Sequence, residues 1–455
     1  MNAAANALQS VLGDTPASTQ HFANPSNDPG KFADPSGAKM QALVWHGKND
    51  VRIDEVAKPR IVDPTDVLVK VTGSTVCGSD LHLLHGAIIQ LKSGDILGHE
   101  YMGVVEEVGS KITKVKPGDR VVASFNIACG NCYACSKKLS SICPNVNTSS
   151  VQQEMYGNQS SGFVGYSHFT GGFAGGQSEY VRMPFGDANL LKIPEGVPDE
   201  TALYLSDVLV TSYHQVMDSG VKEGDIVGIW GLGAIGLLAA KWALLKGASR
   251  IIAIDNVQWR LDNVQAKLGP KVELLNYDEF KNVPKRLNEL TAPGTHGLDA
   301  TRPAGIDVAL ECAAGEYAKG WGHTIEMAVG LETDTSEILN EMIMAVVPFG
   351  TVGITGVYAG YTNHFNIGAV MEKGVRLIGN GQAPVHKWWE EILNDYLIPG
   401  KLDPRELILT HRIPLEDVPK CYTQMDKHEN GIVKTFVETK FSSPPSAGAP
   451  PSTRL

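Results

Sequence analysis

Four cysteines lie within fifteen residues of this chain, at Cys129, Cys132, Cys135 and Cys143. Two intervening residues allow a tight turn to direct a pair of thiolates at one point, and four thiolates around one point form a closed tetrahedral zinc site. A closed site leaves no position for a substrate, so we predict that this zinc is structural. The alternative is a set of disulfides or buried free thiols, which this run of short spacings disfavours.

The composition favours small molecules as binding partners. A chain of 455 residues has room for two or three domains. The formal net charge is −11 and no dense basic run is present, which argues against nucleic acid as a partner. No run approaches the ~20 apolar residues that span a membrane, and no secretory signal is visible. Seven cysteines, of which five fall in proposed metal motifs, suit a reducing compartment, so we expect a cytoplasmic protein.

Both ends of the chain read as flexible tails. Residues 1–39 are rich in Ala, Ser, Asn, Asp and Pro, and residues 442–455 are rich in Ser, Pro and Ala. The last three residues, Thr-Arg-Leu, faintly resemble a peroxisomal address, which is the alternative to a cytoplasmic location.

Two kinds of strand pattern divide the rest of the chain. From residue 41 to about 189, short β-rich runs alternate with Gly and Pro, which is typical of a small barrel-like domain. Residues 226–230 instead form a short apolar run that suits a buried parallel strand. A glycine turn, a helix-like stretch at 234–246 and a second strand at 250–255 follow, so this region is predicted as a βαβ unit.

The glycine turn has the spacing of a dinucleotide-binding motif. Gly231 permits a tight turn, Gly233 allows backbone to approach a pyrophosphate, and Gly236 lets the helix pack on the strand. Phosphate would then lie at the helix N-terminus, where free N–H groups and the helix dipole favour anions. Nineteen residues after the last glycine, Asp255 would accept hydrogen bonds from a ribose and repel a 2′-phosphate, which predicts NAD rather than NADP. Asp255 could otherwise only cap the strand end. The motif as a whole is Gly231, Leu232, Gly233, Ala234, Ile235 and Gly236.

Two further motifs precede the cysteine cluster. They are Cys77-Gly78-Ser79-Asp80-Leu81-His82 and Gly98-His99-Glu100. Together with the cluster and the glycine turn, in this order, they resemble the zinc-dependent medium-chain alcohol dehydrogenases over about residues 40–439. Residues 205–209, 315–323 and 379–385 are most similar to the glutathione-independent formaldehyde dehydrogenase branch.

The resemblance implies an α/β protein with two kinds of domain. A GroES-like, β-rich catalytic domain would cover residues 40–208 and carry the structural zinc lobe. A Rossmann domain with a doubly wound parallel sheet would cover 209–381, and residues 382–441 would return to the catalytic domain. The family also implies a homo-oligomer, with a tetramer favoured over a dimer.

A second, catalytic zinc is implied by three residues. An open zinc site needs three protein ligands and a vacant position, and Cys77 and His99 suit two of them. Many family members have a cysteine as third ligand, whereas this chain has Asp207 at the matching place, as the formaldehyde dehydrogenase branch does. Asp207 could instead only cap a helix.

The resemblance also implies roles for residues around that zinc. Glu100 would lie behind the metal, and Asp80 would orient the histidine ligand. Ser79 would contact the substrate oxygen and pass its proton to His82, nearer water.

Three more residues match cofactor contacts of the family. Thr211 would pack beside the nicotinamide, Arg260 would contact the ribose, and Lys434 would contact the pyrophosphate. Arg260 and Lys434 could otherwise be solvated surface charges. The long connection from 312 to 339 resembles an insertion that covers the bound dinucleotide.

These observations lead to three hypotheses. The first is a zinc- and NAD-dependent dehydrogenase of small aldehydes or alcohols, similar to formaldehyde dehydrogenase, with two zinc ions per chain. The second is a polyol or secondary-alcohol dehydrogenase on the same fold, and the third is a non-catalytic binding or structural member.

Overall fold

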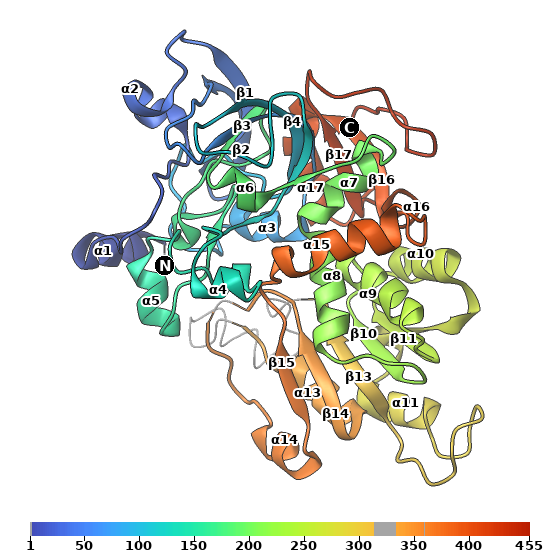
Figure 1. Cartoon of the computed structure of the whole chain (residues 1–455). Helices are drawn as coiled ribbons and strands as arrows, with labels where there is room; N and C mark the ends of the chain where they lie inside the picture. The colour runs from blue at the N-terminus through green and yellow to red at the C-terminus, as the bar shows by residue number, and fades with distance from the viewer. Residues whose placement is uncertain (1, 314–333, 359) are drawn as a thin grey trace. The chain divides into compact units, whose positions relative to one another are not determined.

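Antiparallel and parallel strands separate into two units along the chain (Figure 1). The computed structural model describes residues 2–313, 334–358 and 360–455. The first unit comprises Met1–Val210 and Pro384–Leu455, and the second comprises Thr211–Ala383. Each of the two divisions lies two residues beyond the corresponding predicted boundary, 208/209 and 381/382.

The first unit is built around an antiparallel sheet with one parallel edge pair. The strands follow the order β16-β17-β3-β4-β5-β9, and β8 also pairs with β3. Only β16 and β17 run parallel to each other. A hairpin, β1 with β2, and a short pair, β6 with β7, lie outside this sheet. The bounds are β1 Lys39–Gly47, β2 Asp50–Ala57, β3 Val67–Ser74, β4 Tyr101–Val108, β5 Arg120–Ala123, β6 Asn126–Ile127, β7 Gly162–Phe163, β8 Tyr180–Met183, β9 Leu190–Lys192, β16 Leu409–Pro414 and β17 Lys434–Glu438.

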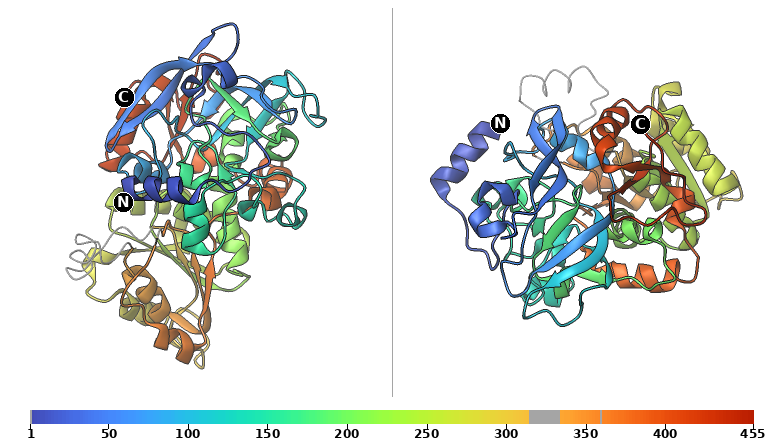
Figure 2. Two further views of the ribbon diagram at one scale, coloured as in Figure 1. Left: turned by 90° about the vertical axis from the view of Figure 1, so that its left-hand side faces the viewer. Right: turned by 90° about the horizontal axis from the view of Figure 1, so that it is seen from above.

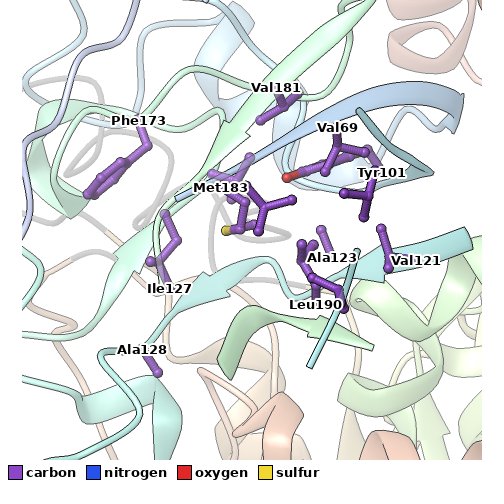
Figure 3. Packing of buried hydrophobic residues seen from close by; sticks show 14 of the residues in the cluster. Val69, Tyr101, Val121, Ala123, Ile127, Ala128, Phe173, Val181, Met183 and Leu190 are labelled. Carbon is purple, nitrogen blue, oxygen red and sulfur yellow. The ribbon is translucent and has the colours of Figure 1, made fainter. Parts of the chain in front are cut away.

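Side chains from these strands meet in one core (Figure 3). Val67, Val69 and Val71 alternate along β3 and join it, as the period of a strand requires. Tyr101 from β4 and Met183 from β8 are fully buried in the same cluster. Each such side chain stabilises the fold by about 1.5–3 kcal/mol relative to an exposed position.

Helices of the first unit connect and flank these strands. The longer ones are α1 Asn2–Leu12, α3 Gly78–Leu84, α5 Ser150–Tyr156, α15 Val385–Ile392 and α17 Val418–Asp426; the one-turn helices are α2 Pro29–Phe32, α4 Tyr133–Ser136, α6 Gly186–Asn189, α7 Asp199–Ala202 and α16 Pro404–Leu407. Helix α8, Val208–Asp218, contains the division between the units.

The second unit is a six-stranded parallel sheet with the order β12-β11-β10-β13-β14-β15. This is the strand order of a doubly wound Rossmann sheet, which confirms the predicted fold class. The bounds are β10 Ile226–Trp230, β11 Arg250–Asp255, β12 Val272–Asn276, β13 Ile306–Glu311, β14 Val346–Ile354 and β15 Arg376–Gly379, with helices α9 Ala234–Leu245, α10 Gln258–Leu268, α11 Val283–Leu290, α13 Glu337–Ala345 and α14 Ile367–Lys373.

The N-terminal segment differs from the flexible tail that we expected. It begins with α1, which contacts α5, and then runs along the first unit (Figure 2). Phe22 and Phe32 are buried, and the N–H groups of Thr15 and Ser18 donate to carbonyls near the cysteine cluster. A few buried apolar side chains are enough to hold this segment in place, because hydrogen bonds fix the backbone between them. The prediction of a flexible tail was wrong because it relied on low hydrophobicity alone.

The C-terminal segment is also bonded to the rest of the first unit instead of being a free tail. The buried guanidinium of Arg412 donates to the carbonyl of Ser443, and Ser446 N–H donates to Glu200. Thr453 N–H donates to the carbonyl of Arg412, and Leu455 N–H donates to Asp417.

Two further expectations concern the long connection from 312 to 339 and membrane-spanning segments. The predicted cover between 312 and 339 falls mostly on residues 314–333, which lie outside the described residues. Within the described part of the chain, every helix is too short or too polar to cross a bilayer.

Candidate active site and metal centres

Helix α3 positions the first residues of the predicted catalytic site. Cys77 is the N-cap of α3, and its N–H donates to Asp80 Oδ2 at 3.0 Å in a capping box. The same carboxylate also contacts His99, which lies just before β4. Asp207 lies just before α8, near the end of the first of the two segments that form the first unit.

The structure brings four potential metal ligands together in the first unit. One ligand atom each from Cys77, His99, Glu100 and Asp207 lies within 4.8 Å of the others. Nε2 of His99 is 3.4 Å from Asp207 Oδ2. Two ligand atoms about 2.1 Å from a tetrahedral zinc lie about 3.4 Å apart, so this pair fits a shared zinc ion.

Asp80 holds His99 in the orientation that a ligand needs. Nδ1 of His99 lies 3.0 Å from Asp80 Oδ1, and both side chains are buried. Burial alone would lower the pKa of His99, but the carboxylates of Asp80 and Asp207 outweigh it and raise that pKa well above its ordinary value. With the Nδ1 proton directed at Asp80, Nε2 is left to bind a metal. The predicted role of Asp80 agrees with this geometry.

Glu100 lies beside His99 Nε2 and is paired with Lys434. Glu100 Oε1 is 3.8 Å from His99 Nε2 and accepts a hydrogen bond from Lys434 Nζ. Glu100 Oε2 is buried without a hydrogen-bond partner among the described residues, so it is a spare oxygen that a nearby cation could use. The sequence suggested a pyrophosphate contact for Lys434, whereas here its side chain is 2% exposed and bonded to Glu100.

The predicted proton relay lies on α3. Ser79 Oγ is 3.4 Å from His99 Nε2, so the hydroxyl lies beside the point that the ligands surround. His82 is one turn further along α3 and 7% exposed, which is more buried than its expected place nearer water.

The four cysteines of the lobe also converge, as predicted. Sulfur–sulfur distances are 3.5 Å for Cys132–Cys135, 3.8 Å for Cys132–Cys143 and 3.9 Å for Cys129–Cys135. A tetrahedron with zinc–sulfur bonds of about 2.3 Å has edges of about 3.8 Å, whereas a disulfide needs about 2.05 Å. All four thiols are free, so the geometry fits a shared zinc and rejects the disulfide alternative.

The glycine motif of the second unit forms the turn between β10 and α9. Gly231 has φ +89°, and a Cβ there would lie 2.9 Å from the carbonyl oxygen of Cys312. A Cβ on Gly236 would lie 1.9 Å from the carbonyl oxygen of Gly231, so only glycine allows the helix to pack this closely. Gly233 is the N-cap of α9 and has open space beside it, where a phosphate could approach the helix N-terminus. Ala234 and Ile235 are the first two residues of that helix.

Asp255 ends β11 beside this turn. Its Oδ2 accepts the N–H of Leu232 at 2.7 Å, and its Oδ1 accepts the N–H of Val257 at 2.9 Å. Arg260 Nη1 lies 3.9 Å from Oδ2 of the same carboxylate. Thr211 lies on the first turn of α8, four residues after Asp207.

Comparison with known proteins identifies the family. Residues 63–195 match the alcohol dehydrogenase GroES-like domain. A zinc-type alcohol dehydrogenase-like protein of Schizosaccharomyces pombe is 39% identical, over 89% of this chain and 92% of that protein. The chain belongs to the zinc-type medium-chain alcohol dehydrogenase family.

Other members of this alcohol dehydrogenase family extend the comparison. A glutathione-independent formaldehyde dehydrogenase of Pseudomonas aeruginosa is 30% identical over 87% of this chain and 96% of that protein. The solved alcohol dehydrogenase TADH of Thermus sp. ATN1 is 31% identical, with a TM-score of 0.72 over 88% of this chain and 99% of that one. The protein is an oxidoreductase, so the non-catalytic hypothesis is set aside.

Two residues near the candidate metal ligands were not singled out from the sequence. Gln177 Nε2 donates to Asp80 Oδ2 at 3.1 Å, and Tyr422 Oη donates to Gln177 Oε1 at 2.8 Å. Both side chains are fully buried. Both residues are far from α3 along the chain, so no local spacing in the sequence predicts these contacts.

Proposed function

We propose that this dehydrogenase oxidises a small aldehyde hydrate or alcohol with NAD, in the manner of formaldehyde dehydrogenase. One catalytic and one structural zinc per chain are part of the proposal. The observation that carries it is that one ligand atom each from Cys77, His99 and Asp207 lies within 4.8 Å of the others in the first unit, with His99 Nε2 3.4 Å from Asp207 Oδ2. Three ligands of this kind leave a fourth position for a substrate oxygen.

Residues around that position would handle the substrate's proton. A bound zinc would polarise the substrate oxygen and ease its deprotonation. Ser79 accepts that hydroxyl proton and passes its own to His82, whose imidazole is suited to titration near neutrality. A bound nicotinamide would supply the acceptor for the hydride of the substrate carbon, so that an aldehyde hydrate would be oxidised to a carboxylic acid while Ser79 and His82 take up the hydroxyl proton.

Asp255 supports NAD as the cofactor in preference to NADP. Its backbone hydrogen bonds hold the carboxylate at the end of β11, next to the glycine turn. A fixed negative charge there would repel a 2′-phosphate while accepting hydrogen bonds from a ribose.

The substrate class rests on Asp207 and on the named relatives. An aspartate in place of the commoner cysteine is shared, by resemblance, with the formaldehyde dehydrogenase branch, and two proteins of that name are 30% identical to this chain. The competing proposal is a polyol or secondary-alcohol dehydrogenase. Both substrates would use the same metal and cofactor, so substrate tests must separate them.

A spectrophotometric screen of NAD reduction tests the function. Formaldehyde, short primary alcohols and polyols would be compared at equal concentration, with NADP in parallel. We expect the highest kcat/KM with formaldehyde or a short alcohol and NAD. A polyol preference would support the competing proposal, and one zinc per chain in metal analysis would contradict the catalytic zinc.

Assembly and location remain proposals based on the family. We propose a homotetramer in the cytoplasm. A peroxisomal address would require residues 453–455 to be presented to a receptor. In the structure, the N–H of Thr453 donates to the carbonyl of Arg412, and the N–H of Leu455 donates to Asp417.

A further inference from the structure

Gln177 is held in a single orientation beside the candidate catalytic site. Its Nε2 donates to two acceptors, the carbonyl of Thr75 at 3.0 Å and Asp80 Oδ2 at 3.1 Å. A flipped amide would direct Oε1 at both of these acceptors, which is unfavourable. The environment of Gln177 therefore assigns its amide nitrogen to Asp80.

Tyr422 reinforces that assignment from the other side. Its hydroxyl donates to Gln177 Oε1 at 2.8 Å from helix α17. Burial, together with the charge of Asp80, raises the pKa of Tyr422 well above its ordinary value, so the hydroxyl keeps its proton. A hydroxyl proton directed at Oε1 leaves only Nε2 to face Asp80.

Gln177 is packed closely against Gly98, the residue before His99. Gly98 has φ +98°, and a Cβ at this position would lie 2.5 Å from both Gln177 Cγ and Gln177 N. The glycine therefore lets Gln177 lie directly against the residue that precedes His99. Asp80, Gln177 and Tyr422 are each buried to 0% exposure.

These hydrogen bonds run in one direction to the candidate ligand. Tyr422 donates to Gln177, Gln177 donates to Asp80, and Asp80 accepts from His99 Nδ1. Each donor fixes the role of the next group, and the last step leaves His99 Nε2 as the ligand atom. Among the described residues, Asp80 receives three donors, since Cys77 N–H also bonds to it.

We propose that Gln177 and Tyr422 are positioning residues, which hold Asp80 so that His99 presents Nε2 to the catalytic metal. This inference rests on the proposed function, because it assumes that His99 is a metal ligand. Groups that hold a ligand from behind typically contribute 10–100-fold to metal affinity. Gln177→Ala would leave Asp80 short of one donor in a buried place, where that loss is costly.

The test is the rate of zinc release from the full-length, zinc-loaded protein into excess chelator, well below the melting temperature. We expect two phases in the wild type, one for each zinc. In Gln177→Ala the phase of the catalytic zinc should be about 10–100-fold faster. In Tyr422→Phe it should be about fivefold faster, since one neutral hydrogen bond is lost. The phase of the cysteine cluster should keep its wild-type rate in both variants.

Tyr101→Phe is the matched control. Tyr101 is as buried as Tyr422, but its hydroxyl has no hydrogen-bond partner among the described residues. Its removal should leave both phases unchanged. A purely structural role for Gln177 would instead lower the melting temperature and leave zinc release at the test temperature unaltered.

The outcomes separate this inference from the proposed function. Wild-type release rates in both variants would overturn the inference while leaving the catalytic zinc in place. If Gln177→Ala does not fold, Tyr422→Phe decides by itself. A wild-type protein that binds zinc only at the cysteine cluster would overturn the proposed function and the inference with it.

Discussion

Lys434 Nζ donates a hydrogen bond to the carboxylate of Glu100, and neither side chain is more than 2% exposed. Burial raises the pKa of Glu100 above its ordinary value, against the opposing attraction of Lys434. Lys434 therefore supplies a positive charge that opposes this shift and favours the carboxylate form of Glu100 beside the candidate metal site.

Lys434→Met should destabilise the first unit by leaving the Glu100 carboxylate without this countercharge. Breaking a buried ion pair from one side costs about 3–5 kcal/mol. The free energy of unfolding in denaturant measures this cost on metal-free protein. The double variant Lys434→Met with Glu100→Gln removes both charges, so it should regain most of the loss. A double variant as unstable as the single one would contradict the pairing.

Asp207→Asn should keep the fold and weaken the catalytic zinc. The change removes one ligand charge while preserving side-chain size. Because residues that only support a ligand contribute 10–100-fold, loss of the ligand charge should cost at least about 100-fold in zinc affinity. Metal content after dialysis and kcat/KM measure the effect. Wild-type zinc content and turnover would remove Asp207 from the site.

Cys135→Ser should release the zinc of the cysteine cluster and destabilise the protein. Binding energy at a closed zinc site is part of the folding energy, so we expect a loss of about 4 kcal/mol in the free energy of unfolding. Metal analysis and thermal melting provide the measurements. Cys421→Ala, which removes a buried thiol outside both clusters, should keep two zinc ions. A Cys135→Ser protein with full zinc content and an unchanged melting temperature would rule out this ligand.

Asp255→Ser should shift cofactor preference towards NADP. Loss of the carboxylate removes a repulsion of roughly 1–3 kcal/mol with a 2′-phosphate, and Arg260 could then attract that phosphate. We expect the ratio of kcat/KM for NADP and NAD to rise by roughly ten- to hundredfold. Asp255→Asn, which retains an oxygen acceptor for the backbone bonds, should shift the ratio in the same direction. A wild-type preference for NADP would contradict the role of Asp255.

His386 predicts a loss of stability in mild acid. Its Nε2 lies 3.1 Å from Asn189 Oδ1, and its Nδ1 is buried with no partner among the described residues, although part of the residue reaches solvent. Burial lowers the pKa of His386 to about 4 from 6.5. The unfolded chain therefore binds a proton below pH 6.5 that the folded protein excludes until about pH 4.

This difference should cost up to about 3 kcal/mol, building up as the pH falls from 6.5 to 4. His386→Gln keeps a donor for Asn189 but does not titrate, so its free energy of unfolding should fall less over the same range. If the free energy of unfolding of the wild type and of this variant fell equally with pH, the pKa of His386 would not be lowered in the folded protein, which would contradict the prediction.

Local patterns were sufficient where the chemistry is local. The cysteines lie within fifteen residues and the glycine turn within six, so a few backbone angles bring each group together. The order of motifs then predicted the family, the Rossmann sheet and a ligand set that the structure brings within 4.8 Å. Low hydrophobicity was a poor guide at both ends of the chain, because backbone hydrogen bonds hold these segments to the first unit.

The sequence by itself determined the family, the two kinds of sheet and the residue types that suit zinc and a dinucleotide. Only the tertiary structure decided which partners support them. Lys434 reaches Glu100 from a strand near the end of the chain. Gln177, just before β8, bonds to Asp80, and Tyr422 of α17 bonds to Gln177. Such contacts depend on how distant elements pack in the first unit, and a buried polar group takes whichever partner that packing supplies.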